Sequence, residues 1–236
     1  MPDTRSTSVP GTVRARALPA GPGPTARLIL LLLLAAVLVG LATAVLSLPP
    51  VAPGLGAVVT EHLPASGVEH PVTAVLLNFR GYDTLLELAV LWLALLAVWS
   101  LTPAPLAHEP TANPMLAALN QLLAPLMILV AGYLLWNGGH APGGAFQAGA
   151  VLGATGVLLH LSGRRLPRAV DGWPLRLALL LGVALFSLIG LAVMAGGAPF
   201  LTYPPASAGG LILAIEAAAT LSIAATLAAL FLGGRP

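Results

Sequence analysis

The chain has 236 residues, of which 58% are hydrophobic and only 8% are charged, and its formal net charge is +2. Soluble globular domains carry roughly 25% charged residues, so this composition excludes that class and predicts a membrane protein. The absence of cysteine excludes disulfides, cysteine nucleophiles and thiolate-bound iron–sulfur clusters. The basic residues are all arginines next to apolar runs, and we interpret them as topology signals, with no nucleic acid as a partner.

The N-terminal region combines a polar tail with a strongly apolar run. Residues 1–26 are rich in Pro, Gly, Ser, Thr and Arg, which predicts a disordered tail. The run at 28–48 has a signal peptide as its alternative interpretation, because Arg27 precedes it and Ala42-Thr43-Ala44 resembles a cleavage site. The run exceeds the usual length of a signal's apolar region, which favours a retained helix. A loop at 49–71 follows, and its histidines have no identifiable partners.

Six apolar runs reach the length of about 20 residues that crosses a bilayer core of about 30 Å. We predict spans at about 28–48, 82–101, 115–136, 143–162, 174–195 and 208–232. Pro125 lies inside the third span and should kink it. The segment 102–114 contains four prolines and is the predicted linker and domain boundary.

The arginines support this number of spans. With a cytoplasmic N-terminus, six spans place every arginine except Arg80 on the cytoplasmic side, as the positive-inside rule requires. The arginines that follow the rule are Arg5, Arg14, Arg16, Arg27, Arg164, Arg165, Arg168, Arg176 and Arg235. The predicted fold class is therefore an all-α polytopic protein of the cell (inner) membrane with about six transmembrane helices and both termini in the cytoplasm.

Two acids near the start of the second span share one helix face. Asp83 and Glu87 are four residues apart, and Arg80 lies close to the same stripe. Charged groups inside spans are costly and usually face a bundle interior, a partner or water. One interpretation is an ion or proton relay with Arg80 as the charge partner. The other is an interfacial cluster at the helix start, where the helix dipole favours carboxylates.

The last span carries a single acid. Glu216 lies about two turns into the span, with Thr220 one turn further and no basic residue nearby. An isolated acid in an apolar helix is a candidate for ion or proton transfer. The alternative is a protonated carboxyl group that donates a structural hydrogen bond to a neighbouring helix.

A glycine-dense junction, residues 138–149, follows the third span and includes the start of the fourth. Such a junction must be buried in protein or line a wet cavity. Gly138-Gly139 suits a helix end and Pro142 a helix start, so turn chemistry explains much of it. His140 remains a candidate for proton transfer. The junction lacks metal-ligand spacing and the residues of a phosphate-binding loop.

The fourth span also carries packing signals. Ala145, Gly149 and Gly153 are spaced by four, which permits close helix–helix approach. Gln147 needs a hydrogen-bond partner, and it predicts an inward or subunit-facing side.

The segment 113–233 resembles the B subunit of the multisubunit Mrp-type sodium/proton antiporter (the MnhB/MrpB-like family), which is shared with membrane-bound hydrogenase modules. The resemblance rests on Gly139-His140-Ala141-Pro142-Gly143-Gly144-Ala145-Phe146, where the family usually shows Gly-His-x-x-Pro-Gly-Gly-Gly-Phe. Here one residue separates His140 from Pro142 where the family has two, and Ala145 replaces a glycine. Pro125, Tyr133 and Glu216 also look similar to family positions.

The upstream segment 72–101 is similar to a different piece of the same machinery. Residues 79–87 match the Phe-Arg-Gly-x-Asp-Thr-x-x-Glu stretch in the C-terminal part of the Mrp A subunit or in its small hydrogenase-module equivalent. The resemblance implies that Asp83 and Glu87 take part in cation movement. Together with the tail at 1–26 and the linker at 102–114 that composition predicts, it divides the chain into a two-helix membrane segment at 27–101 and a four-helix MrpB-like domain at 115–236.

The resulting functional prediction is a non-catalytic subunit of a multisubunit cation/proton antiporter. Its partners are the other subunits, Na⁺, H⁺ and the lipid bilayer, and no cofactor or metal site is predicted. The alternative is an ion-translocating or purely structural adaptor subunit of a redox-driven complex such as a membrane-bound hydrogenase. The sequence shows no nucleophile–base set or cofactor fingerprint that would indicate an enzyme.

Overall fold

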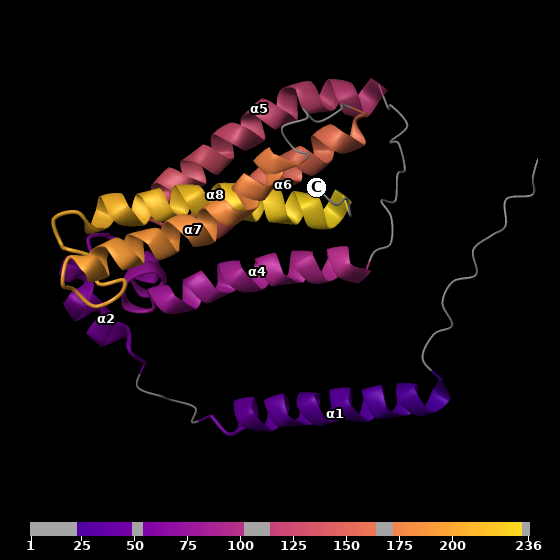
Figure 1. The fold of residues 1–236 in the computed structure, drawn as a ribbon, viewed down its shortest axis with the longest axis horizontal. Helices are drawn as coiled ribbons and strands as arrows, with labels where there is room; N and C mark the ends of the chain where they lie inside the picture. The colour runs from indigo at the N-terminus through magenta and orange to yellow at the C-terminus, as the bar shows by residue number, and fades with distance from the viewer. Residues whose placement is uncertain (1–22, 49–53, 102–113, 164–171, 233–236) are drawn as a thin grey trace, which may run out of the picture. The chain divides into compact units, whose positions relative to one another are not determined.

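The computed structural model describes residues 23–48, 54–101, 114–163 and 172–232, and within them every regular element is a helix (Figure 1). The chain divides into two compact units, residues 1–54 and 55–236. Residues 1–22 of the predicted tail, most of the predicted linker, and the arginines at 5, 14, 16, 164, 165, 168 and 235 lie outside the described residues. Residues 24–26, which were predicted to belong to the disordered tail, are helical. The topology that rests on those arginines stays a prediction.

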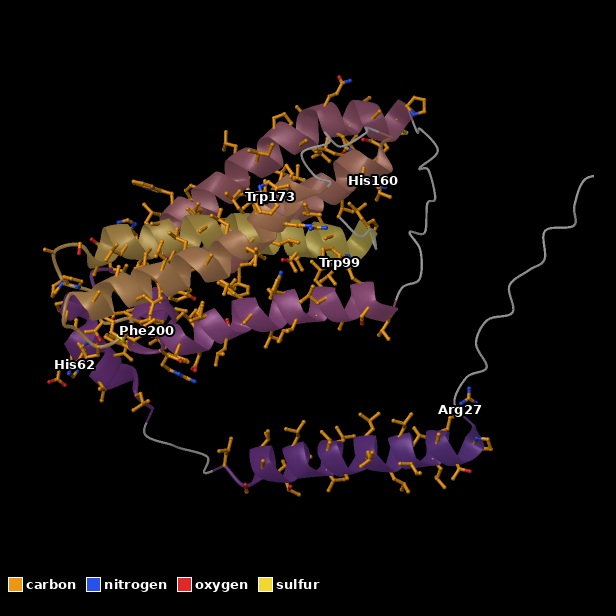
Figure 2. All side chains as sticks on the ribbon, viewed as in Figure 1. Arg27, His62, Trp99, His160, Trp173 and Phe200 are labelled. Atoms are coloured by element: carbon orange, nitrogen blue, oxygen red, sulfur yellow. The ribbon has the colours of Figure 1, made fainter. Side chains whose placement is uncertain are left out.

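The first unit contains a single helix, α1 (Pro24–Leu46). The mean hydropathy of its most apolar 18-residue stretch is 3.0, and all its residues are exposed. Figure 2 shows apolar side chains projecting from α1 on every side. A helix without a polar face suits a lipid environment. The choice between a retained helix and a signal peptide stays a prediction.

The second unit contains five long helices that follow the predicted spans to within two residues at each end. They are α4 (Gly81–Leu101), α5 (Pro114–Asn137), α6 (Ala145–Leu161), α7 (Trp173–Ala195) and α8 (Ala208–Leu232). Five of the described helices, α1 included, are long and apolar enough to cross a membrane, and α6 is shorter at 17 residues. The predicted all-α polytopic class is confirmed, with α6 as the shortest of the six predicted spans.

Helix α8 is the most buried of the membrane-length helices and packs against α4, α6 and α7. Gly149 and Gly153 lie where α6 crosses α8, and a Cβ on Gly149 would come within 2.8 Å of Ile223. On another side of α8, the Ser222 hydroxyl donates a 2.7 Å hydrogen bond to the Leu179 carbonyl of α7. Small residues and this hydrogen bond hold α8 at the centre, as in other membrane bundles.

The ribbon of α5 bends partway along its length (Figure 1). Helix α5 is assigned without interruption through the internal Pro125. A proline inside a helix lacks the N–H that would bond one turn back, which accounts for a bend.

The segment 55–80, most of which the sequence analysis treated as loop, is largely helical. It comprises α2 (Gly56–His62), the 3₁₀ turn η1 (Leu63–Ala65), α3 (Pro71–Ala74) and the π-helical turn η2 (Val75–Phe79). These elements are too short for a helical period to stand out in the sequence. They lie at the end of the unit where α8 begins, because Gly67 packs directly against Gly209.

Candidate functional site

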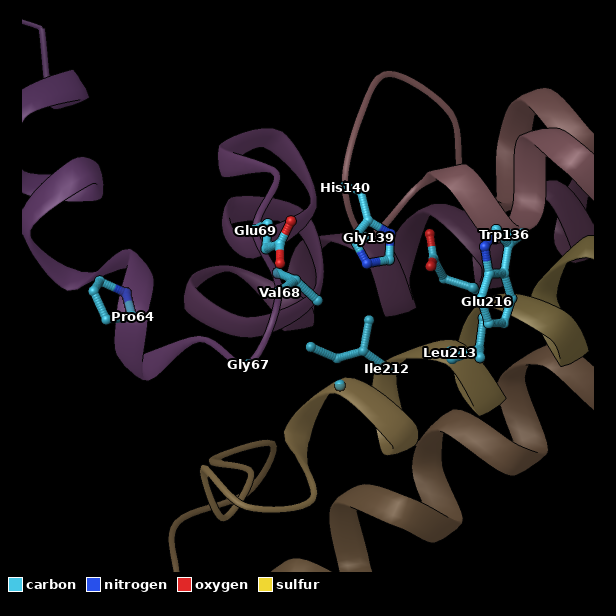
Figure 3. Close-up of a pocket in the computed structure, with 11 residues that line it drawn as sticks. Pro64, Gly67, Val68, Glu69, Trp136, Gly139, His140, Ile212, Leu213 and Glu216 are labelled. Atoms are coloured by element: carbon cyan, nitrogen blue, oxygen red, sulfur yellow. The ribbon is translucent and has the colours of Figure 1, made fainter.

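A cavity of about 400 Å³ opens at this end of the second unit (Figure 3). Four parts of the chain build its wall: the segment before α3, the end of α5, the junction after it, and the first turns of α8. The lining residues are Pro64, Gly67, Val68, Glu69, Trp136, Gly139, His140, Gly209, Ile212, Leu213 and Glu216. The cavity thus collects three titratable side chains, Glu69, His140 and Glu216, on an otherwise mostly apolar wall.

Glu216 is the buried acid of this cavity. Its residue exposure is 4%, and it lies eight residues into α8, about 12 Å along the helix axis at 1.5 Å per residue. The backbone N–H of Ala145, at the start of α6, faces the carboxyl group as a hydrogen-bond donor. The Thr220 hydroxyl donates to the backbone carbonyl of Glu216 at 2.8 Å and leaves the carboxyl group free to face the junction.

Two junction glycines make room for this carboxyl group. A Cβ on Gly144 would lie 2.8 Å from Glu216 Oε1, and one on Gly138 would lie 3.1 Å from the same atom. Gly144 also has φ +105°, a conformation that residues with a Cβ rarely adopt. Ala145, which replaces a family glycine, is already helical in α6, where a Cβ is tolerated. Gly144 is therefore the glycine that the acid requires, whereas a Cβ on Gly138 would first meet the backbone of Gly144, at 2.7 Å.

His140 lies at the rim of the same cavity. Its backbone N–H donates to the Asn137 carbonyl at 2.9 Å in a tight turn at the end of α5. The residue is exposed while still lining the cavity. In Figure 3 its ring lies between the carboxyl groups of Glu69 and Glu216. The structure therefore brings together the two separate predictions, His140 and Glu216.

Glu69 is the site residue that the sequence analysis missed. Its backbone N–H and that of His70 both donate to the Gly139 carbonyl at 2.9 Å. The buried Thr73 hydroxyl donates to the neighbouring carbonyl of Gly138. The contact joins positions about 70 residues apart, and no periodic pattern near Glu69 points to the junction. The only signal in the sequence was the adjacent acid and histidine, Glu69 and His70, in a segment that was predicted to be a loop.

The acids of α4 lie outside this cavity. Arg80 and Asp83 form an ion pair at the start of the helix, with 70% and 44% of their side chains exposed. Glu87 is exposed, whereas Thr84 and Leu88 on the adjoining face are buried. Within the second unit, Glu87 therefore faces outward from the bundle.

The remaining predicted motif residues have structural surroundings. Phe146 packs against the main core cluster, and Pro142 and Gln147 are exposed. Gly143 sits directly against the Leu134 carbonyl, where a Cβ has no room. Among the described residues, no group of three His, Asp or Glu side chains is placed to hold a metal ion.

Two solved structures resemble the fold. A chain in the structure of the Mrp complex from Dietzia sp. DQ12-45-1b matches with a TM-score of 0.62 and 24% identity, over 94% of this chain and 27% of that chain. A chain of the membrane-bound sulfane sulfur reductase, an archaeal respiratory membrane complex, matches with a TM-score of 0.62 and 24% identity, over 89% of this chain and 97% of that chain. This chain thus spans about a quarter of the first relative and nearly all of the second.

The sequence itself matches a family description over its C-terminal half. No curated protein matches the chain. The domain related to the MnhB subunit of Na⁺/H⁺ antiporter matches residues 115–234, which cover α5 to α8 together with the junction. The structural match to the Mrp-complex chain extends beyond this domain into the upstream segment. The chain belongs to the family of domains related to the MnhB subunit of Na⁺/H⁺ antiporters.

Proposed function

We propose that this protein is a membrane subunit of a multisubunit cation/proton antiporter, acting in ion transport and assembly and not as an enzyme. The observation that carries the proposal is the placement of carboxylates on membrane-length helices, at Glu87 and Glu216, in a chain with an MnhB-related domain. Acids at such positions are costly unless they bind ions, carry protons or meet a partner. The other subunits of such a complex, Na⁺ and H⁺ are the proposed partners.

The α4 acids fit a route that is shared with a neighbouring subunit. Glu87 is exposed on a helix that is otherwise apolar along this stretch, so another subunit or water must complete its surroundings. Asp83 lies one turn earlier and forms an ion pair with Arg80, about two turns before Glu87. The same exposure would also suit a purely structural adaptor that docks its neighbour through Glu87.

Replacing Glu87 by Gln in the intact complex separates these roles. We expect Na⁺-dependent proton movement in inverted membrane vesicles to be lost while the complex still assembles. The matched control is Glu61→Gln, which changes an exposed acid on the short helix α2. Unchanged ion coupling with normal assembly would reject the role of Glu87 in transport, and loss of assembly would favour the adaptor.

A redox-driven host complex is the second candidate. It is favoured by the coverage of the structural matches, because this chain spans 97% of the sulfane sulfur reductase chain and 27% of the Mrp-complex chain. The two hosts differ in their energy source. An antiporter exchanges Na⁺ for H⁺ in vesicles that carry only an imposed pH gradient, whereas a redox pump moves ions only when an electron donor is supplied.

The division of the chain into an A-subunit-like segment at 27–101, a linker at 102–114 and a B-subunit-like domain at 115–236 is part of the same proposal. The family match supports it, because the matched region begins at residue 115. Hydrogen bonds from Glu69, His70 and Thr73 to the junction join the two segments.

A further inference from the structure

We propose that the cavity is a water-filled proton path in which Glu69 collects protons, His140 relays them and Glu216 is the buried acceptor. This inference rests on the proposed transport function and specifies which ion uses this site. It assigns a role to Glu69 and places a second ion-handling site in the chain, separate from the acids of α4.

The first support is the position of Glu216. The residue is almost entirely buried, yet it lines a cavity of about 400 Å³. Such a volume holds on the order of ten water molecules at roughly 30 Å³ each. Water in the cavity supplies the hydration that an acid on a membrane helix needs. Glu216 therefore has a solvent route of its own within the chain.

The second support is the set of groups that faces the carboxyl, which fits a proton better than a metal cation. Hard cations such as Na⁺ require several oxygen ligands. Here the backbone group that bonds the carboxyl group is the Ala145 N–H, a donor. The carbonyls of Gly138 and Gly139 already accept hydrogen bonds from the segment 69–73. The side chains of the lining residues Trp136, Ile212 and Leu213 contain no oxygen.

The third support is the sequence of titratable groups along the cavity. Glu69 and His140 are the titratable residues that line it together with Glu216, and both are exposed while Glu216 is buried. The helices α6 and α7 contribute no lining residue. The two ring nitrogens of an imidazole allow it to accept a proton on one side and donate one on the other, which suits a relay between two carboxylates.

The fourth support is the way in which Glu69 is held. Its backbone N–H binds the carbonyl of Gly139, the residue before His140. Glu69 and His140 are therefore held next to each other along the backbone, and a movement of the junction would move both. Under the predicted topology this end of the bundle faces the outer side of the membrane, so the path would admit protons from outside.

The absence of cysteine from the chain permits a direct test of water access. Single cysteines are introduced by Glu69→Cys, His140→Cys and Leu213→Cys in the assembled complex, and a membrane-impermeant maleimide is applied to right-side-out and inverted vesicles. We expect labelling of all three from one side only. Ile128→Cys, on the middle of α5, is the control and should stay unlabelled. A Leu213→Cys variant that is unlabelled from both sides would overturn the proposal.

Transport measurements then test the roles of the acids. We expect Glu216→Gln to abolish proton-coupled transport in an assembled complex. Glu69→Gln should slow transport most at alkaline pH, where free protons are scarce, and Glu69→Asp should restore it. A structural role for Glu69 would not produce this pH dependence. If Glu216→Gln prevents assembly, the pH dependence of transport in Glu69→Gln tests the proposal instead. A pH dependence equal to that of the wild type would reject the relay.

The outcome at Glu87 distinguishes this inference from the proposed function. Loss of transport in Glu87→Gln with full transport in Glu216→Gln and Glu69→Gln would overturn the proton path and leave the transport function standing. Full transport in all three variants, with normal assembly, would overturn both.

Discussion

Helices α4 and α8 each carry an acid, but their surroundings differ. Glu87 of α4 is exposed on the outside of the bundle, whereas Glu216 of α8 is buried beside a cavity that its own chain builds. The environment of Glu216 is therefore complete within this subunit, and that of Glu87 depends on what surrounds the subunit. Substitutions around Glu216 should therefore change the stability of the isolated subunit. Substitutions around Glu87 should mainly change ion transport by the assembled complex.

The largest effect is expected from Gly144→Ala, which alters the space around Glu216. The new Cβ would meet Glu216 Oε1 at 2.8 Å on a backbone with φ +105°, and such backbone strain alone costs about 1–3 kcal/mol. We expect a clear drop in the thermal unfolding temperature of the purified subunit. Gly156→Ala is the matched control, because its Cβ would be 3.8 Å from the nearest atom. Equal stability of the two variants would contradict the close packing of Gly144 against the Glu216 carboxyl group.

A smaller loss is expected from Thr73→Val, which removes the hydroxyl bonded to the Gly138 carbonyl. Leaving a buried acceptor without its donor costs about 1–3 kcal/mol. Hydrogen exchange should become faster at the backbone amides of residues 138–144. The control is Thr60→Val, since that exposed hydroxyl bonds only to the Gly56 carbonyl of its own helix. Unchanged exchange at the junction would show that the contact does not hold it.

The ion pair of α4 should matter little to the isolated subunit. Exposed pairs contribute about 0–1 kcal/mol, and both partners are substantially exposed. The double variant Arg80→Gln with Asp83→Asn should therefore unfold at nearly the wild-type temperature but alter transport in the complex. A large loss of stability in the isolated subunit would remove the contrast between the two regions.

The smallest effect is expected at Tyr203, in the connection between α7 and α8. Its hydroxyl is buried and has no hydrogen-bond partner among the described residues, and burial raises the pKa of the phenol. Because the folded pKa lies above the unfolded one, stability is lost as the pH rises above about 10. Tyr203→Phe should keep the stability at neutral pH and lessen the alkaline loss. Tyr82→Phe, at an exposed position, should change neither.

The sequence predicted the long helices well, because apolar runs of membrane length leave few alternatives. It also singled out Glu216 and His140, each as an isolated polar group in apolar surroundings. It did not predict that these two residues share a cavity, since that depends on how α8 packs against the junction. The short helices at 56–79 and the position of Glu69 in the cavity wall were missed because they depend on contacts with residues far along the chain.

The resemblance to two different subunits predicted a boundary near 102–114, yet residues 55–101 before it and 114–232 after it belong to one compact unit. Sequence patterns and composition can locate the boundary between two segments that resemble different subunits. They do not reveal whether the pieces pack together, because packing depends on side-chain shape and on backbone groups such as the Gly138 and Gly139 carbonyls.

Those two carbonyls have a consequence for how the complex is put together. They accept hydrogen bonds from the backbone N–H groups of residues 69 and 70 and from the Thr73 hydroxyl, and these bonds place the upstream segment on the MnhB-related domain. The peptide connection through 102–113 adds a different constraint. It guarantees equal numbers of the two segments and delivers both to the membrane in a single synthesis, so neither segment has to find the other by diffusion.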